Sequence, residues 1–191
     1  MKVAAGSLKD VEVPAFLIGQ YPVTVYEYGV YLERTGAARP ENWDEQSQHL
    51  SRPVTRVNWE EAGAYCNWAD GRLPTDSEWE FAASIHGSAP GDEPRVFPWG
   101  DDKPTPEHAN YTETRLGSPT PVGLFPVGAT PAAIFDMAGN VWEWSEGGNR
   151  LRGAGFFNGA RDLRAAFRND SHPDYGRSGN IGFRCAREVF P

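Results

Sequence analysis

Three helix-start signals occur in the first 80 residues and set the framework for the fold. Each is a capping box, in which a small polar residue is followed three positions later by a glutamate. The pairs are Thr24 with Glu27, Asn58 with Glu61, and Thr75 with Glu78. In such a pair each side chain bonds the backbone N–H of the other residue, which fixes the first helical turn. The sequence therefore predicts two or three helices that begin after these residues, with Gly36 and Gly71 as stops.

Segments with a strand pattern are short. Residues 11–18 predict a strand, which Pro14 places at an edge or a bulge. Gly139 and Asn140 form a tight turn, after which Trp142 and Trp144 fall on one face of an alternating stretch. Both tryptophans are therefore expected in the core. Residues 182–186 predict a closing strand.

Glycine and proline interrupt the rest of the chain. There are 21 Gly and 16 Pro, and aromatic residues make up 13% of the sequence, with seven Trp. This combination favours loops held by aromatic packing, such as a packed corner at residues 97–100 within the long irregular stretch 85–131. No repeat or linker divides the chain. We expect one domain over residues 1–191, of the α+β class with few short strands, two or three helices and much irregular loop.

Charge and motif content exclude several function classes. The formal net charge of −8 and the pI of about 5.0 disfavour nucleic-acid binding. No apolar run approaches membrane-spanning length, and no signal peptide is recognised, so we expect no membrane insertion and a cytoplasmic location by default, with surface display open. The four histidines are scattered, without the spacing of a catalytic triad or a metal cluster. The two cysteines also lack metal-ligand spacing.

Six motifs in a fixed order resemble the domain of the formylglycine-generating enzyme, the oxidase that matures sulfatases. They are Pro22–Thr24, Trp59–Cys66, Arg72–Glu80, Phe97–Gly100, Asp136–Trp144 and Gly182–Cys185. The resemblance covers nearly the whole chain. It implies a C-type-lectin-like fold of the formylglycine-generating enzyme type, with little regular structure. Fold alone does not decide the activity.

The catalytic residues of that family are missing. Its enzymes use a copper-binding cysteine pair between the tryptophan-rich motif and the final Gly-Phe-Arg-Cys, but residues 152–181 contain no cysteine. We therefore expect no catalytic residues and no enzyme activity. Cys66 and Cys185 match a structural pair of the family instead. The resemblance implies that they lie close together, and either a disulfide or two neighbouring free thiols fits.

The resemblance also implies a structural calcium ion at the tryptophan-rich motif, although no cofactor is required. The matching positions offer two carboxylates and two backbone carbonyls, an oxygen-only set that suits calcium. They are Asp136, Gly139, Val141 and Glu143. A solvated or salt-bridged pair of carboxylates in a turn is the alternative.

A second resemblance concerns the C-terminal segment. Its motifs are similar to the end of diversity-generating retroelement variable proteins, and they are Arg152-Gly153, Leu163–Asn169, Pro173-Asp174 and Ile181–Cys185. In those proteins an error-prone reverse transcriptase copies a template and misreads adenines. Asparagine codons then become codons for many residues, at surface positions of the lectin-like site. The resemblance implies a variable region over residues 151–185.

The residue content of this segment agrees with that mechanism. A codon whose third base is C, with any base at the first two positions, cannot encode Trp, Met, Lys, Gln or Glu. Residues 151–187 contain none of the five, whereas the other 154 residues contain thirty. The candidate diversified positions are all reachable from an Asn or Ser codon by changing adenines. They are Gly155, Phe156, Phe157, Asn158, Gly159, Asp162, Phe167, Asp170, Ser171, His172, Tyr175, Gly176, Ser178, Gly179 and Asn180.

The segment also contains residues suited to a fixed frame and to ligand contact. Arginines can bond the carbonyls of neighbouring loops, and the four expected to do so are Arg152, Arg164, Arg168 and Arg184. The aromatic residues among small polar ones resemble a paratope. Phe156 and Phe157 are adjacent, so at most one need be in the core.

The sequence therefore predicts a ligand-binding protein, expected to be a monomer, that recognises a protein or cell-surface ligand through a diversified surface. Two alternatives stay open. One is an oxidase of the formylglycine-generating type that acts on a peptide cysteine. The other is a lectin-like module with a fixed partner or a structural role.

Overall fold

A computed structural model describes residues 1–9, 11–85, 87, 93–170 and 177–189. Within them, the three predicted capping boxes all form. The helices that they start are α1 (Val25–Thr35), α3 (Trp59–Trp68) and α4 (Asp76–Ser84). Gly36 ends α1 in the left-handed conformation (φ 71°), as expected of a glycine cap. Helix α3 already ends at Trp68, ahead of Gly71. A short helix α2 (Trp43–Gln46) was not predicted.

The strands form three small sheets. The first has the order β1 (Lys2–Val3), β4 (Phe16–Ile18), β9 (Ala186–Glu188), and all its neighbours are antiparallel. The second is the hairpin of β2 (Gly6–Leu8) and β3 (Val11–Val13). The third has the order β7 (Arg168–Asp170), β6 (Arg150–Arg152), β5 (Trp142–Trp144), β8 (Ile181–Gly182), with β5 and β8 parallel.

Two predicted strands are wrong as single elements. Residues 11–18 divide at Pro14 into β3 and β4, which belong to different sheets, because proline cannot donate a ladder hydrogen bond. Residues 182–186 likewise divide between β8 and β9. The chain thus leaves the third sheet after Gly182 and joins the first at Ala186, so the two sheets are joined by the stretch that contains Cys185.

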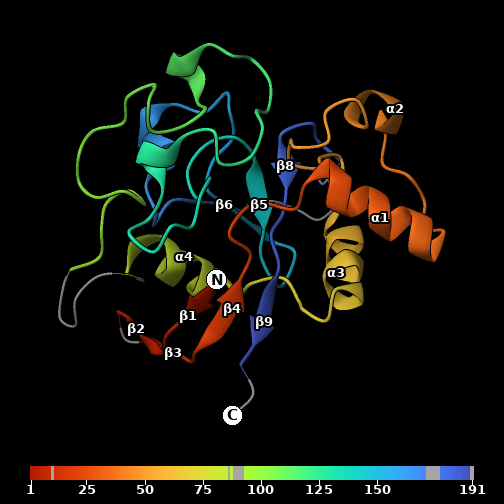
Figure 1. Cartoon of the computed structure of the whole chain (residues 1–191). Coiled ribbons are helices and arrows are strands. Elements are labelled where there is room, and N and C mark those ends of the chain that lie inside the picture. Colours follow the sequence, from red (N-terminus) through yellow and green to blue (C-terminus); the bar gives the residue numbers. More distant parts are fainter. Residues whose placement is uncertain (10, 86, 88–92, 171–176, 190–191) are drawn as a thin grey trace.

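The elements surround two clusters of buried side chains. In Figure 1, α1 and α3 lie together on one side of β8 and β9, and α4 lies on the other side, near β1. The first cluster includes Trp142, Trp144 and Phe183, and the second is centred on Trp79 of α4. Trp142 and Trp144 are 3% and 0% exposed, which confirms their predicted place in the core.

Three 3₁₀ helices interrupt the irregular stretches: η1 (Thr112–Thr114), η2 (Pro126–Gly128) and η3 (Ala160–Leu163). The predicted corner at residues 97–100 is confirmed, because the rings of Phe97 and Trp99 stack with centroids 5.1 Å apart. The α+β class with short elements and much loop is therefore confirmed. None of the helices described is long and apolar enough to span a bilayer.

Candidate ligand-binding surface

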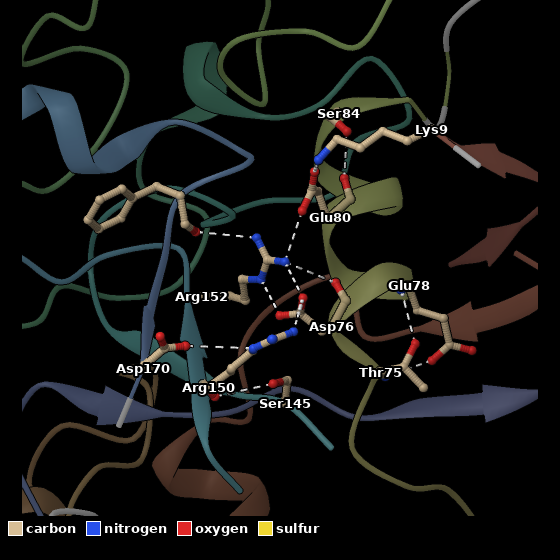
Figure 2. A network of polar contacts seen from close by, with 11 residues as sticks. Lys9, Thr75, Asp76, Glu78, Glu80, Ser84, Ser145, Arg150, Arg152 and Asp170 are labelled. Atoms are coloured by element: carbon tan, nitrogen blue, oxygen red, sulfur yellow. Dashed lines mark hydrogen bonds and ion pairs between the residues drawn. The ribbon is translucent and has the colours of Figure 1, made fainter. Parts of the chain in front are cut away.

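An ion-pair network joins β6, at the start of the C-terminal segment, to α4, as Figure 2 shows. Arg152 is fully buried, and its Nε and Nη2 donate to the two carboxylate oxygens of Asp76 at 2.6 Å each. Nη2 also donates to Glu80 at 2.9 Å. Arg150 adds a bond to Asp76 at 3.0 Å. Burial alone would raise the pKa of Asp76, but the hydrogen bonds and charges of the two arginines outweigh it and lower that pKa.

A second buried ion pair ties β5 to the end of the segment. Arg184 donates through Nε and Nη2 to the two oxygens of Glu143, at 2.7 Å each, and both side chains are 0% exposed. The remaining donors reach backbone carbonyls, including those of Gly19 at 3.0 Å and Phe135 at 2.9 Å. Arg184 therefore joins the stretch that follows β4, the tryptophan-rich motif and the closing motif in one unit.

The expected arginine framework is correct for two of the four side chains. Arg184 bonds carbonyls as predicted, and Arg152 bonds mainly carboxylates, with a longer contact to the carbonyl of Phe167 at 3.4 Å. Arg164 and Arg168 are exposed, and neither guanidinium donates a hydrogen bond to any part of the chain that the structure describes. Their predicted framework role therefore finds no support among the described residues.

Between these two ion-pair networks, residues 155–163 form an outward loop. The backbone N–H of Gly155 donates to Oδ1 of Asn158 at 3.0 Å, and Nδ2 of Asn158 donates to Asp162 at 2.9 Å. The loop is also held from outside the segment. Thr112 donates its N–H to the carbonyl of Asn158 at 3.0 Å and its hydroxyl to the carbonyl of Phe157 at 2.5 Å. The loop backbone is thus fixed without using the Phe157 side chain.

The candidate diversified positions differ in exposure. Phe157 (54% exposed), Gly159 and Asp170 are exposed. Most of the others are half-buried, and these are Phe156, Asn158, Asp162, Phe167, Ser178, Gly179 and Asn180. Ser171, His172, Tyr175 and Gly176 lie outside the described residues. We call the exposed and half-buried candidates, except Phe167, the variable surface.

Gly155 and Phe167 are corrections to the expected surface set. Gly155 is buried, and a Cβ atom there would lie 3.3 Å from Cδ1 of Trp142, so a larger side chain would require Trp142 to shift. Phe167 packs against the first core cluster, with its ring 6.0 Å from that of Trp142. Both lie where the segment turns inward to meet the buried face of β5.

The sequence does not indicate the roles of two residues that lie beside the variable surface. Thr112 braces the loop as described above. Arg56 donates its backbone N–H to the carbonyl of Ser178 at 3.1 Å. Neither belongs to a motif, and each lies far from the C-terminal segment in sequence, so no local signal could have identified them.

The two cysteines form a disulfide. Cys66 of α3 and Cys185 are bonded with their Cα atoms 5.5 Å apart, across a sequence separation of 119 residues. The structure thereby decides between the two alternatives that the sequence left open. Because the chain has only these two cysteines, the disulfide leaves it without a thiol.

The residues expected to bind calcium do not fit that ion as they are arranged. Both oxygens of Glu143 are taken by Arg184, and Nε1 of Trp79 donates to one of them at 2.8 Å. Asp136 accepts from the N–H of Gly123 at 2.7 Å, and its burial raises its pKa to about 6. No group of three His, Cys, Asp or Glu side chains suitable for a metal occurs among the described residues. The salt-bridged alternative describes Glu143 better.

Gly139 and Val141, whose backbone carbonyls are the other two expected calcium ligands, lie in the same packed turn. Gly139 donates its N–H to the carbonyl of Gly153 at 2.7 Å, and its positive φ of 78° suits glycine. A Cβ atom there would lie 2.4 Å from the carbonyl oxygen of Asn110. Val141 is fully buried. The turn is therefore fixed by packing and hydrogen bonds within the chain.

Comparisons with known proteins agree with this architecture. Residues 3–189 match the family described as sulfatase-modifying factor enzyme 1-like domain. Hercynine oxygenase of Mycobacterium tuberculosis is 32% identical, covering 94% of this chain and 54% of that protein. Inactive C-alpha-formylglycine-generating enzyme 2 of Mus musculus is 36% identical, covering 73% of this chain and 50% of that protein. The chain thus spans about half the length of these relatives.

Among solved structures, Treponema denticola variable protein 1 has the same fold, with a TM-score of 0.67 at 22% identity. The likeness covers 94% of this chain and 86% of that one. The C-type-lectin-like fold of the formylglycine-generating type is thereby confirmed. The relatives include both an enzyme and a protein described as inactive, so membership alone does not assign an activity. On the match over residues 3–189, this chain belongs to the sulfatase-modifying factor enzyme 1-like domain family.

Proposed function

We propose that this domain is a non-catalytic binding module that recognises a protein or cell-surface ligand through the variable surface, and that a retroelement diversifies this surface. The display side chains would supply the contacts, and the two buried arginine networks would keep the backbone fixed as the side chains change. A rigid frame limits the conformational entropy lost on binding.

The observation that carries the proposal is the difference in burial, within residues 151–187, between positions expected to stay constant and positions expected to vary. Eight of the side chains expected to be constant are buried, and they are Leu151, Arg152, Ala154, Leu163, Ala165, Ile181, Phe183 and Arg184. Arg164, Arg168 and Asn169, which are also expected to be constant, are exposed. Nearly all described candidates for diversification are exposed or half-buried. Both groups lie in the one segment that lacks Trp, Met, Lys, Gln and Glu. Diversification at adenines predicts this combination, since only outward positions can vary without disturbing the core.

Two of the comparisons support the proposal. The fold is shared with a protein whose name calls it variable, and one relative is described as inactive. The state of the two cysteines argues against an oxidase of the formylglycine-generating type. Both cysteines are joined in a disulfide, and a disulfide sulfur is not a thiolate nucleophile or metal ligand.

The DNA around the gene tests the diversification directly. We expect a near-duplicate of the codons for residues 151–185, beside a reverse transcriptase gene. The duplicate should carry adenines where it differs, at the codons of exposed positions such as Phe157 and Asp170. If the duplicate is missing, or if its differences fall at the codons of buried positions such as Leu163 and Phe183, the proposal is wrong and a fixed module is favoured.

The oxidase alternative has its own test. The purified domain is incubated with copper, oxygen and a cysteine-containing peptide, and the peptide is followed by mass spectrometry. We expect the peptide cysteine to remain unchanged beyond the copper-only control. Conversion of the cysteine to an aldehyde that depends on this protein would establish an enzyme instead.

A further inference from the structure

A cavity of about 170 Å³ lies next to the variable surface. Its wall comes from four separate parts of the chain: Val25, residues 42–56, residues 118–119, and Gly179. The first three parts lie outside the segment predicted to vary. From this arrangement we infer that the cavity receives a carboxylate side chain of the protein ligand, and that residue 179 decides whether it is open. This inference rests on the proposed function.

The floor of the cavity is held in place by hydrogen bonds. Gln46 of α2 donates through Nε2 to the carbonyls of Glu41 at 3.0 Å and Thr55 at 3.3 Å. Its Oε1 accepts the backbone N–H of Thr55 at 3.0 Å. One amide side chain therefore links α2 to the strand-like stretch at residues 53–55, and Thr55 is only 6% exposed. The cavity is a fixed feature of the fold because its wall is bonded on both sides.

Arg56 connects the cavity to the variable surface. Its backbone N–H bonds Ser178, as described above, and its positive φ of 58° is unusual for a residue with a side chain. The Arg56 side chain is 33% exposed. It reaches Glu41 only through one contact of 3.5 Å, and that carboxylate is 60% exposed, so the pair is weak and readily exchanged for a ligand carboxylate.

The charges that line the cavity favour an anion. Arg52 and Arg56 both contribute to its wall, against the single carboxylate of Glu45. The side chain of Arg52 is half-buried and has no hydrogen-bond or ion-pair partner among the residues that the structure describes. A guanidinium offers a planar pair of N–H donors that matches the two oxygens of a carboxylate. Aspartate or glutamate of a protein ligand supplies that group.

Gly179 leaves the Arg56 guanidinium uncovered. A Cβ atom at position 179 would lie 3.4 Å from Nη2, 3.7 Å from Nε and 3.8 Å from Cζ of Arg56. Its φ is not in the left-handed region, so other residues fit the backbone. Because position 179 is a diversification candidate, a larger residue there would cover the guanidinium and close the cavity. Diversification at one codon would thereby switch carboxylate recognition on or off.

The test measures binding of N-acetyl-glutamate amide to the folded domain by NMR, through the Nε–Hε signals of Arg52 and Arg56. Neutral N-acetyl-glutamine amide is the matched probe without the charge. We expect the acid to shift both signals with saturation, and the amide to bind at least about tenfold more weakly, because it lacks the charge-assisted pair. Equal effects of the two probes, or no saturable shift, would overturn the inference.

Two variants locate the binding. Gly179→Phe is expected to weaken binding of the acid at least about tenfold by filling the space over Arg56. Gly159→Phe is its control, because Gly159 is an exposed candidate glycine and no atom lies within 4 Å of the added Cβ. Arg52→Gln is expected to weaken binding without unfolding the domain, as a thermal melt would verify. Unchanged binding in Gly179→Phe would contradict the role of position 179, while leaving the DNA test of diversification unaffected.

Discussion

Glu143 and Arg184 form a two-point ion pair in the interior, with both N–O distances 2.7 Å and neither side chain exposed. Glu143 comes from the tryptophan-rich motif and Arg184 from the closing motif, 41 residues later. Their bond explains why both motifs belong to one structural unit.

Glu143→Gln should destabilise the fold by about 3–5 kcal/mol, because it leaves the buried Arg184 without its counter-charge. Urea unfolding measures the change in the free energy of unfolding. Asp170→Asn is the control, since its contact with Arg150 is long (3.7 Å) and the carboxylate is 86% exposed. That change should cost no more than about 1 kcal/mol. Equal effects would contradict the assigned importance of the buried pair.

Calcium should not stabilise the folded domain. A ligand that binds only the folded state stabilises it by an amount that grows with the logarithm of its concentration relative to Kd. The Glu143 carboxylate, however, is already used by Arg184 and Trp79. Thermal unfolding with millimolar calcium and with chelator should give the same midpoint. A calcium-dependent rise that disappears in Glu143→Gln would show that the ion displaces Arg184.

Exposed candidate positions should tolerate large changes that buried ones do not. Gly159→Tyr and Phe157→Ser should alter the free energy of unfolding by no more than about 0.5 kcal/mol, as at other exposed sites. Gly155→Tyr should cost about 1–3 kcal/mol or more, because its side chain would meet Trp142. Chemical denaturation of the three variants checks this order. A stable Gly155→Tyr would return Gly155 to the variable surface.

The stability of the domain should depend on pH through Asp136. Desolvation raises the pKa of this carboxyl from 3.8 to about 6, against the opposing hydrogen bond from Gly123. Between those two values the folded protein holds a proton that the unfolded chain has lost. Stability is therefore greatest at the low end of this window and falls as pH rises to about 6, by up to about 3 kcal/mol.

Asp136→Asn should remove that part of the slope, because the amide keeps an oxygen acceptor for Gly123 and does not titrate. Unfolding free energies of both proteins from pH 4 to 7 give the comparison. Asp76 and Glu78, whose pKa values are lowered from 3.8 and 4.5, contribute with the opposite sign as pH falls below those values. An identical slope in the two proteins would mean that the Asp136 carboxyl is charged in the folded state.

Loss of the disulfide should cost about 2–5 kcal/mol, because Cys66 and Cys185 close a loop of more than a hundred residues in the unfolded chain. The thermal midpoint of the protein with and without reductant measures the loss. The double variant Cys66→Ala with Cys185→Ala should match the reduced protein. A midpoint insensitive to reductant, with free thiols detected, would contradict this prediction.

The sequence by itself determined the features that depend on neighbouring residues. Helix starts at Thr24, Asn58 and Thr75 were predictable because a capping box is complete within four residues. The placement of Trp142 and Trp144 followed from the two-residue period of a strand. The ordered motifs gave the family, and the absence of a cysteine from residues 152–181 gave the expectation of no enzyme activity. The motifs and residue content of residues 151–187 gave the expectation of a binding protein.

Only the tertiary structure decided which partners distant residues take. It joined Cys66 to Cys185, gave Glu143 to Arg184 instead of leaving it for a metal, and turned Gly155 inward against Trp142. It also set Arg56 beside Gly179. The physical reason is that burial and pairing depend on how separate segments pack in space, and the local pattern of a chain carries little information about contacts between residues so far apart.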